Sequence, residues 1–236
     1  MNKWSIFGLL RRLPGTCLLC SSSNHHDDLD ICCDCRQELP YLINVCDTCS
    51  LPLPTDVNGV CGRCQTNPPH FDHTFSLFHY ATPVDKLIQR LKFNNRLIYA
   101  RTLGGLFAQA IVKRTPNLWP ECIIPVPLHQ KRLRTRGFNQ AMELARPVAA
   151  KLLTNIDNHC CNRILDTKPQ SSLAAKQRRN NIRHAFTVDA SIPWKKVVIF
   201  DDVMTTGQTV NALAKTLKER GVEEVSVWCI ARAIPS

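Results

Sequence analysis

The sequence predicts an α/β domain, built on a mostly parallel sheet flanked by helices, with a small Cys-rich module in front of it. The apolar run at residues 197–200 shows no polar alternation, so it suits a strand that is buried on both faces of a sheet. An amphipathic helix and a second apolar strand at 225–230 follow directly, and this order is typical of a parallel pair. Nine of the 13 cysteines lie between residues 17 and 64. We therefore expect two domains, residues 1–67 and residues 68–236.

The chain of 236 residues is basic, with a formal net charge of +11 at pH 7. Such an excess favours phosphorylated or nucleic-acid partners, and it is also common on solvated surfaces. No apolar run reaches the roughly 18 residues of a membrane span. The apolar residues 6–10 precede two arginines instead of following them, unlike a signal peptide. We expect a cytoplasmic protein, because the cytoplasm keeps thiols reduced.

Eight of the cysteines form four C-x-x-C pairs, a spacing typical of zinc ligands, since zinc binds four thiolates from paired turns. A disulfide scaffold needs an even number of cysteines, whereas this chain has 13. The pairs can combine in sequence around two ions or interleave, and the pattern leaves both arrangements open. Residues 15–66 contain too little apolar material for a core, so we expect structural zinc to hold them together. The expected ligands are Cys17, Cys20, Cys32, Cys35, Cys46, Cys49, Cys61 and Cys64.

Residues 65–112 predict a linker, a strand and two helices. Pro68 and Pro69 exclude a helix or strand interior from the linker. Thr82 and Pro83 are typical of the start of a helix, and Lys92 falls near its end. Lys92 suits a cation at a helix C-terminus at least as well as a substrate contact. The elements expected here are a strand at 75–80, a helix from 82 and a helix at 97–112.

A basic loop at residues 128–140 follows the short apolar strand expected at 123–124. Four of its residues between 131 and 136 are cations, which as a lone run are typical of a solvated face. This loop, however, leaves a strand and enters a helix at 141–153, so we expect it at the same sheet edge as the end of the 197–200 strand. Arginine binds phosphate oxygens in pairs, so the loop predicts pyrophosphate binding. We also expect a kink or restart at Pro147, inside the helix.

A second basic segment, at residues 163–188, is polar and mostly without periodicity. A long segment of this kind inside a compact domain is typical of a functional lid, and plain mobility is the alternative.

The run at residues 197–209 predicts a sugar-phosphate site. Its strand delivers Asp201 and Asp202 to the sheet edge where α/β proteins bind ligands, and carboxylates accept hydrogen bonds from vicinal hydroxyls. The turn after them contains Gly207, which tolerates positive φ, and three threonines. The following helix points its free N–H groups at the same place. The alternative is an ordinary N-cap and turn.

These motifs resemble the ComF family, also called ComF/GntX, over nearly the whole chain. The matching residues are the four C-x-x-C pairs, 125–129, 132–134, 136–140, Thr167, Gln170, Leu173, 178–180, Phe186 and 197–209. The last run also looks like the phosphoribosyl pyrophosphate (PRPP) signature of type I phosphoribosyltransferases. The resemblance implies a zinc-ribbon module followed by a type I phosphoribosyltransferase-like domain.

The resemblance also implies roles for individual residues. The PRPP-binding residues would be Asp201, Asp202, Met204, Thr205, Thr206, Gly207, Gln208 and Thr209. The pyrophosphate loop would contain Pro127, His129, Arg132, Arg136 and Gly137. The flexible catalytic loop would contribute Gln170, Arg178 and Arg179. Magnesium would be held by the pyrophosphate and hydroxyls of the ligand, together with water.

Two functions from different classes agree with these motifs. In one, the protein is a phosphoribosyltransferase of the competence type that uses PRPP and magnesium and is linked to DNA uptake or utilization. In the other, the zinc module and the basic loops contact single-stranded DNA or a DNA-translocation protein, and the PRPP site is regulatory or vestigial. The acceptor that would take the phosphoribosyl group is left open.

Overall fold

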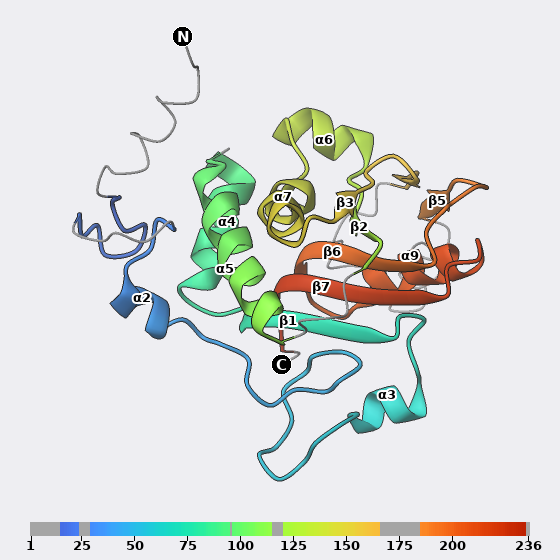
Figure 1. The fold of residues 1–236 in the computed structure, drawn as a ribbon, viewed down its shortest axis with the longest axis horizontal. Helices are drawn as coiled ribbons and strands as arrows, with labels where there is room; N and C mark the ends of the chain where they lie inside the picture. The colour runs from blue at the N-terminus through green and yellow to red at the C-terminus, as the bar shows by residue number, and fades with distance from the viewer. Residues whose placement is uncertain (1–14, 24–28, 95, 115–119, 166–184, 235–236) are drawn as a thin grey trace, which may run out of the picture.

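The strand that carries the acid pair, β6, lies at the centre of the molecule. The computed structural model describes residues 15–23, 29–94, 96–114, 120–165 and 185–234. Five parallel strands form the main sheet in the order β1-β7-β6-β2-β3 (Figure 1). Their bounds are β1 His73–His79, β2 Cys122–Pro125, β3 Asn155–Ile156, β6 Lys196–Met204 and β7 Glu224–Arg232. The expected parallel sheet is confirmed.

Helices cover both faces of the sheet. Val198 and Phe200 of β6 pack in one core with α4 (Val84–Asn94), α5 (Ile98–Arg114) and α7 (Gln140–Leu152). Val197 and Ile199 pack in the opposite core with α9 (Gln208–Lys218). Successive side chains of a strand point to opposite faces, so an unbroken apolar run fills both cores.

The Cys-rich module runs along the β1 edge of the sheet (Figure 1). The backbone N–H of Leu42 donates to the carbonyl of Leu77 at 3.0 Å, and that of His79 donates to Pro40 at 2.8 Å. The short helices of the Cys-rich module are α2 (Cys33–Gln37) and α3 (Gly62–Thr66). Ile31 belongs to the core under α5, whereas Cys49 belongs to the core under α9. Both cores therefore contain residues from each side of the predicted domain boundary at residue 67.

Of the kink or restart expected at Pro147, the restart does not occur, because α7 continues from Gln140 to Leu152 as one helix. Pro147 packs against Gly104 of α5. A Cβ at Gly104 would overlap the carbonyl oxygen of Leu144 and lie 3.0 Å from the Pro147 ring. The packing energy of this close helix–helix contact offsets the loss of the backbone hydrogen bond that proline cannot donate.

The basic stretch expected as a loop contains a helix, α6 (Gln130–Arg136). Seven residues with few apolar positions carry no amphipathic stripe, so periodicity could not reveal it. A separate antiparallel pair, β4 (Cys161–Arg163) and β5 (Phe186–Val188), flanks the main sheet. None of the helices in the described ranges combines the length and hydropathy of a membrane span.

Candidate functional site

The acid pair lies within the last part of β6, and its two carboxylates have different surroundings. Asp201 and Asp202 alternate in direction, as neighbours in a strand do. Asp202 lies on the α4 side, because the Nζ of Lys92 contacts its Oδ2 at 2.6 Å. Asp201 accepts a hydrogen bond at 2.8 Å from the backbone N–H of Asp202. One carboxylate is therefore paired with a cation and the other with a main-chain donor.

Lys92 is the site residue for which the sequence left two roles open. Its side chain is 22% exposed and that of Asp202 is 13% exposed, so their ion pair is shielded from much of the solvent. Lys92 comes one turn after Ile88, and both face the side of α4 that carries the buried residues Val84, Leu87 and Leu91. The sequence contains a signal for this contact: Lys92 stands at a position where the helical spacing of α4 predicts a buried apolar residue. It connects α4 directly to the acid pair.

Asp201 has an unusually high pKa. Burial raises the pKa of its carboxyl, the neighbouring charge of Asp202 raises it further, and the result is about 7. The backbone N–H of Asp202 and the charges of Lys92 and Arg163 act in the opposite direction. Perturbed carboxyls of this kind gather at functional sites, because such sites need charges close together.

The turn after the acids begins α9 and faces solvent. Gly207 has a φ of 78° and serves as the N-cap, in the left-handed region that favours glycine. The side chains of Thr205 and Thr206 are exposed. The hydroxyl of Thr206 accepts a bond at 3.4 Å from the N–H of Gln208. The first N–H groups of an α-helix have no acceptor within the helix, so those of this turn are suited to bind an anion.

Two predicted members of the PRPP set occupy less open positions. Met204 is 2% exposed, and its side chain belongs to the core under α9. Thr209 is half-buried at the start of α9. Met204 can therefore contribute only its main chain to a ligand.

The segment that leads from β2 to the basic residues starts next to β6. The backbone N–H of Val126 donates to the carbonyl of Phe200 at 2.8 Å, so this segment begins beside the acid pair. His129 caps α6 by accepting a bond at 3.3 Å from Lys131 N, and Gly137 ends the helix with a φ of 77°. Pro127, which lies between Val126 and His129 in the chain, is half-buried.

Arg132 and Arg136 share one side of α6, since they are four residues apart. Both are half-buried, whereas Lys131 and Arg134 are exposed. Arg136 Nη1 donates to the Oε1 of Gln140 at 2.9 Å. The Nε2 of Gln140 is buried without a hydrogen-bond partner in the described part of the chain. Polar groups therefore collect where α6 meets α7.

The predicted catalytic residues Gln170, Arg178 and Arg179 lie outside the described residues. Their roles remain predictions.

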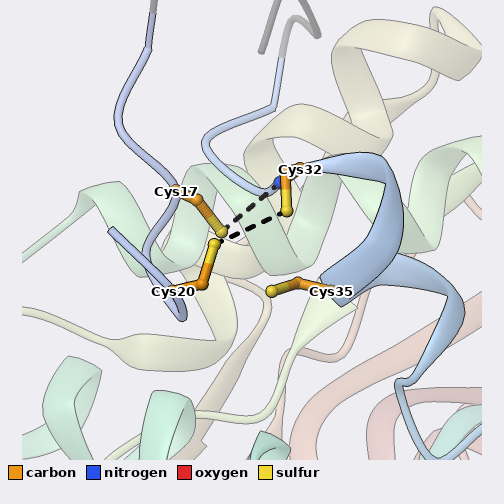
Figure 2. Close-up of side chains that lie close together, drawn as sticks. All are labelled: Cys17, Cys20, Cys32 and Cys35. Carbon is orange, nitrogen blue, oxygen red and sulfur yellow. Dashed lines mark hydrogen bonds between the residues drawn. The ribbon is translucent and has the colours of Figure 1, made fainter. Parts of the chain in front are cut away.

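The eight cysteines of the four C-x-x-C pairs form two groups of four in sequence order. Within each group the Sγ atoms all lie within 4.8 Å of one another. Figure 2 shows the first group converging on one point. Of the two arrangements left open, the structure shows the sequential one. The groups are Cys17, Cys20, Cys32 and Cys35, and Cys46, Cys49, Cys61 and Cys64.

The geometry of both groups fits zinc. Tetrahedral Zn–S bonds of about 2.3 Å separate neighbouring sulfurs by about 3.8 Å. The Sγ atoms of Cys20 and Cys32 are 3.7 Å apart, and those of Cys49 and Cys61 are also 3.7 Å apart. Burial raises the pKa of Cys46, but the backbone N–H groups of Cys61 and Cys49 outweigh it and lower the pKa to about 7. Backbone donors of this kind support thiolates, the form that binds metal.

Arg232 was missed by the sequence analysis, although an arginine that ends an apolar strand is unusual. It is 1% exposed, and its guanidinium lies between the second Cys group and the turn after β6. Arg63 of α3 also reaches this turn, at the carbonyl of Thr206, at 3.4 Å.

Comparisons with known proteins agree with this architecture. A family model described as Double zinc ribbon domain matches residues 10–65, and one described as Phosphoribosyl transferase domain matches residues 139–234. Competence protein F of Haemophilus influenzae is 37% identical over 226 residues, which cover 92% of this chain and 96% of that protein.

Two further relatives also align over most of their length. DNA utilization protein YhgH of Escherichia coli K12 is 34% identical and covers 94% of this chain and 99% of that protein. Competence protein ComFC of Bacillus subtilis is 26% identical and covers 92% of this chain and 95% of that protein.

Proposed function

Because the chain belongs to the competence protein F family, we propose that it is a phosphoribosyltransferase that binds PRPP with magnesium and serves the use of external DNA. The observation that carries this proposal is that three groups stand at the carboxyl ends of two neighbouring parallel strands, β6 and β2. They are the acid pair of β6, the threonine turn that begins α9, and the basic helix α6 that follows β2.

Each group suits one part of the ligand. Asp201 and Asp202 accept hydrogen bonds from the ribose hydroxyls. The turn from Thr205 to Thr209 binds the 5′-phosphate with backbone N–H groups and hydroxyls, at the positive end of α9.

The pyrophosphate belongs beside α6. Arg132 and Arg136 supply paired donors, and the positive φ of Gly137 lets the backbone turn toward the ligand. In our proposal Gln170, Arg178 and Arg179 close over the same phosphates.

Magnesium prefers oxygen ligands, and the carboxylates of Asp201 and Asp202 offer such ligands at this sheet edge. Asp202 already pairs with Lys92 at 2.6 Å, so the oxygens of the ligand itself would provide most of the metal contacts. When bound, magnesium would neutralise pyrophosphate charge. The two Cys groups hold structural zinc, which requires a reducing compartment, and we place the protein in the cytoplasm.

In the proposed reaction, the bond between C1 of the ribose and the pyrophosphate oxygen breaks, and pyrophosphate leaves with the bonding electrons. A nucleophilic atom of the acceptor bonds to C1 from the opposite face and loses its proton. Arg132 and Arg136 stabilise the charge that develops on the pyrophosphate.

Calorimetric titration with PRPP and magnesium tests the binding step. The wild type should bind, and the double variant Asp201→Asn/Asp202→Asn should lose the binding while keeping its fold. Release of pyrophosphate with a candidate acceptor then tests transfer. Equal affinity of the two proteins for PRPP would contradict the proposed site.

A second candidate function is contact with single-stranded DNA. The observation that favours it is the outer face of α6, where Lys131 and Arg134 are exposed. Cations of this kind bind DNA backbones in a salt-dependent manner. Fluorescence anisotropy with labelled single-stranded DNA separates the two functions, because Lys131→Ala/Arg134→Ala should weaken DNA binding and the Asp201/Asp202 double variant should not.

A further inference from the structure

The second zinc-ribbon knuckle, which contains Cys46, Cys49, Cys61 and Cys64, contacts the turn assigned to the 5′-phosphate. We propose that this knuckle positions the phosphate turn through Arg232 and Arg63, so that zinc at the second site controls the affinity for a ribose phosphate. This inference rests on the proposed sugar-phosphate site.

Arg232 joins the knuckle to the turn. Its Nε donates to the carbonyl of Cys49 at 2.9 Å. Its Nη1 donates to the carbonyls of Met204 at 2.8 Å and Ala233 at 2.6 Å, and also to that of Thr205. These partners are all main-chain oxygens, so the guanidinium fixes backbone positions. One contact is to a zinc ligand, one is to the last residue of β6, and one is to the first residue of the phosphate turn.

Arg63 makes the next contact along the turn. It lies in α3 between the ligands Cys61 and Cys64, so its position depends on the knuckle. Its Nη2 donates to the carbonyl of Thr206 at 3.4 Å. Arg232 and Arg63 therefore hold three successive carbonyls, those of residues 204, 205 and 206, on the side of the knuckle.

The direction of these carbonyls decides where the N–H groups point. In a planar trans peptide the C=O and N–H bonds point in opposite directions. When the carbonyls of Met204, Thr205 and Thr206 face the knuckle, the N–H groups of Thr205, Thr206 and Gly207 face away from it. This is the arrangement that an anion needs at the start of α9.

The knuckle also compensates the buried charge of Arg232. Four thiolates and one zinc ion carry a net charge of about −2, and a buried cation needs such a partner. Without zinc, the knuckle would no longer fix the carbonyl of Cys49 to which the guanidinium donates.

The knuckle has two further connections to this region. The hydroxyl of Ser50 donates to the carbonyl of Thr74 in β1 at 2.7 Å. Beyond the knuckle, the N–H of His70 donates to the Oδ1 of Asn211 in α9 at 2.6 Å. The second site is therefore connected to β1, and the segment after it is connected to α9, the helix that starts at the turn.

The first knuckle provides an internal comparison, since its contacts are to α5. Arg36 Nη2 donates to the Oε1 of Gln109 at 2.6 Å, and Arg101 pairs with Asp30. Cys17 and Cys46 have equivalent positions: both are buried, and each sulfur accepts a bond from the N–H of the ligand fifteen residues later.

The experiment compares Cys46→Ser/Cys61→Ser with Cys17→Ser/Cys32→Ser. Each variant should retain about one zinc ion per chain by elemental analysis. Titration with ribose 5-phosphate should give an affinity at least about tenfold weaker for the Cys46/Cys61 variant, and less than about threefold weaker for the Cys17/Cys32 variant. Equal weakening in both variants would overturn the inference.

Surface variants keep the test decisive if a zinc variant does not fold. Arg63→Met should weaken ribose 5-phosphate binding by about three- to tenfold, the effect of one hydrogen bond of ordinary strength, because its contact with Thr206 is long and exposed. Arg63→Lys should recover part of the affinity. Arg220→Met removes the same charge at the other end of α9 and serves as the control. Equal effects of the Arg63→Met and Arg220→Met substitutions would overturn the positioning role.

Amide hydrogen exchange separates this inference from the proposed function, because it needs no ligand. Peptides that cover residues 203–212 should exchange faster in the Arg63→Met and Cys46/Cys61 variants than in the wild type and the controls. If the wild type binds no ribose 5-phosphate but this difference appears, the proposed function fails and the positioning role stands. Unchanged exchange would overturn the positioning role.

Discussion

Asp201→Asn should make the protein more stable at alkaline pH although it removes a carboxylate that we propose to bind the ribose. The pKa of the Asp201 carboxyl is raised from 3.8 to about 7 by burial and by the charge of Asp202. Between these two values the folded state holds a proton that the unfolded state has released. The free energy of unfolding therefore falls as pH rises through this window, and it levels off above pH 7. Asparagine has no proton to lose, so the variant lacks this fall.

The magnitude follows from the width of the window. Each pH unit between the two pKa values is worth about 1.4 kcal/mol, so the interval from pH 5 to pH 7 is worth at most about 2.7 kcal/mol. Asp201 is only half-buried by accessible surface, and solvent screening reduces the effect. We expect the variant to gain about 1–2 kcal/mol on the wild type between pH 5 and pH 8.

Urea unfolding of both proteins at pH 5, 6, 7 and 8, with zinc retained, measures this difference. Subtracting the two profiles cancels the titration of all groups that the variant leaves unchanged. Asp202→Asn is the matched control, because it breaks the 2.6 Å ion pair with Lys92. It should lower the free energy of unfolding by about 1–3 kcal/mol at neutral pH. Parallel profiles for the wild type and Asp201→Asn would refute the assignment of the raised pKa.

Three further predictions concern other parts of the molecule. Elemental analysis of the purified protein should find two zinc ions per chain, because each group of four sulfurs fits one ion, and a value near one would contradict a double site. Arg132→Ala should weaken PRPP binding by roughly ten- to a hundredfold, and less so at high salt. Unchanged affinity would show that the cations of α6 belong to an ordinary solvated surface. Gly104→Ala should lower the free energy of unfolding by about 1–3 kcal/mol, because its Cβ would overlap the carbonyl of Leu144. An unchanged urea midpoint would show that α5 and α7 can move apart without loss of stability.

Much of the fold could be predicted because its information is local. The run at 197–200 predicted a strand buried on both faces, and β6 contains it, continuing through Asp201 and Asp202 to Met204. The helix after Gly207 and the strand at 225–230 were also predicted, and they are α9 and β7. Residue order and periodicity are enough for such elements, since each depends on neighbours within a few positions.

The cysteine pattern was equally informative about chemistry and less so about arrangement. C-x-x-C spacing predicts turns that present two sulfurs together, which is a local property. Which turns share an ion depends on how the chain folds back between them. Only the tertiary structure decided that Cys17 meets Cys35 and that Cys46 meets Cys64.

The sequence by itself therefore determined the succession of β6, α9 and β7, the metal-binding spacing and the residue types at the end of β6. The tertiary structure decided the contacts between them: Lys92 with Asp202, Arg232 with Cys49 and Thr205, and Val126 with Phe200. These partners are separated by tens of residues or more along the chain. Their contacts depend on strand order and helix packing, and no periodicity in the sequence specifies which distant residue a side chain will meet.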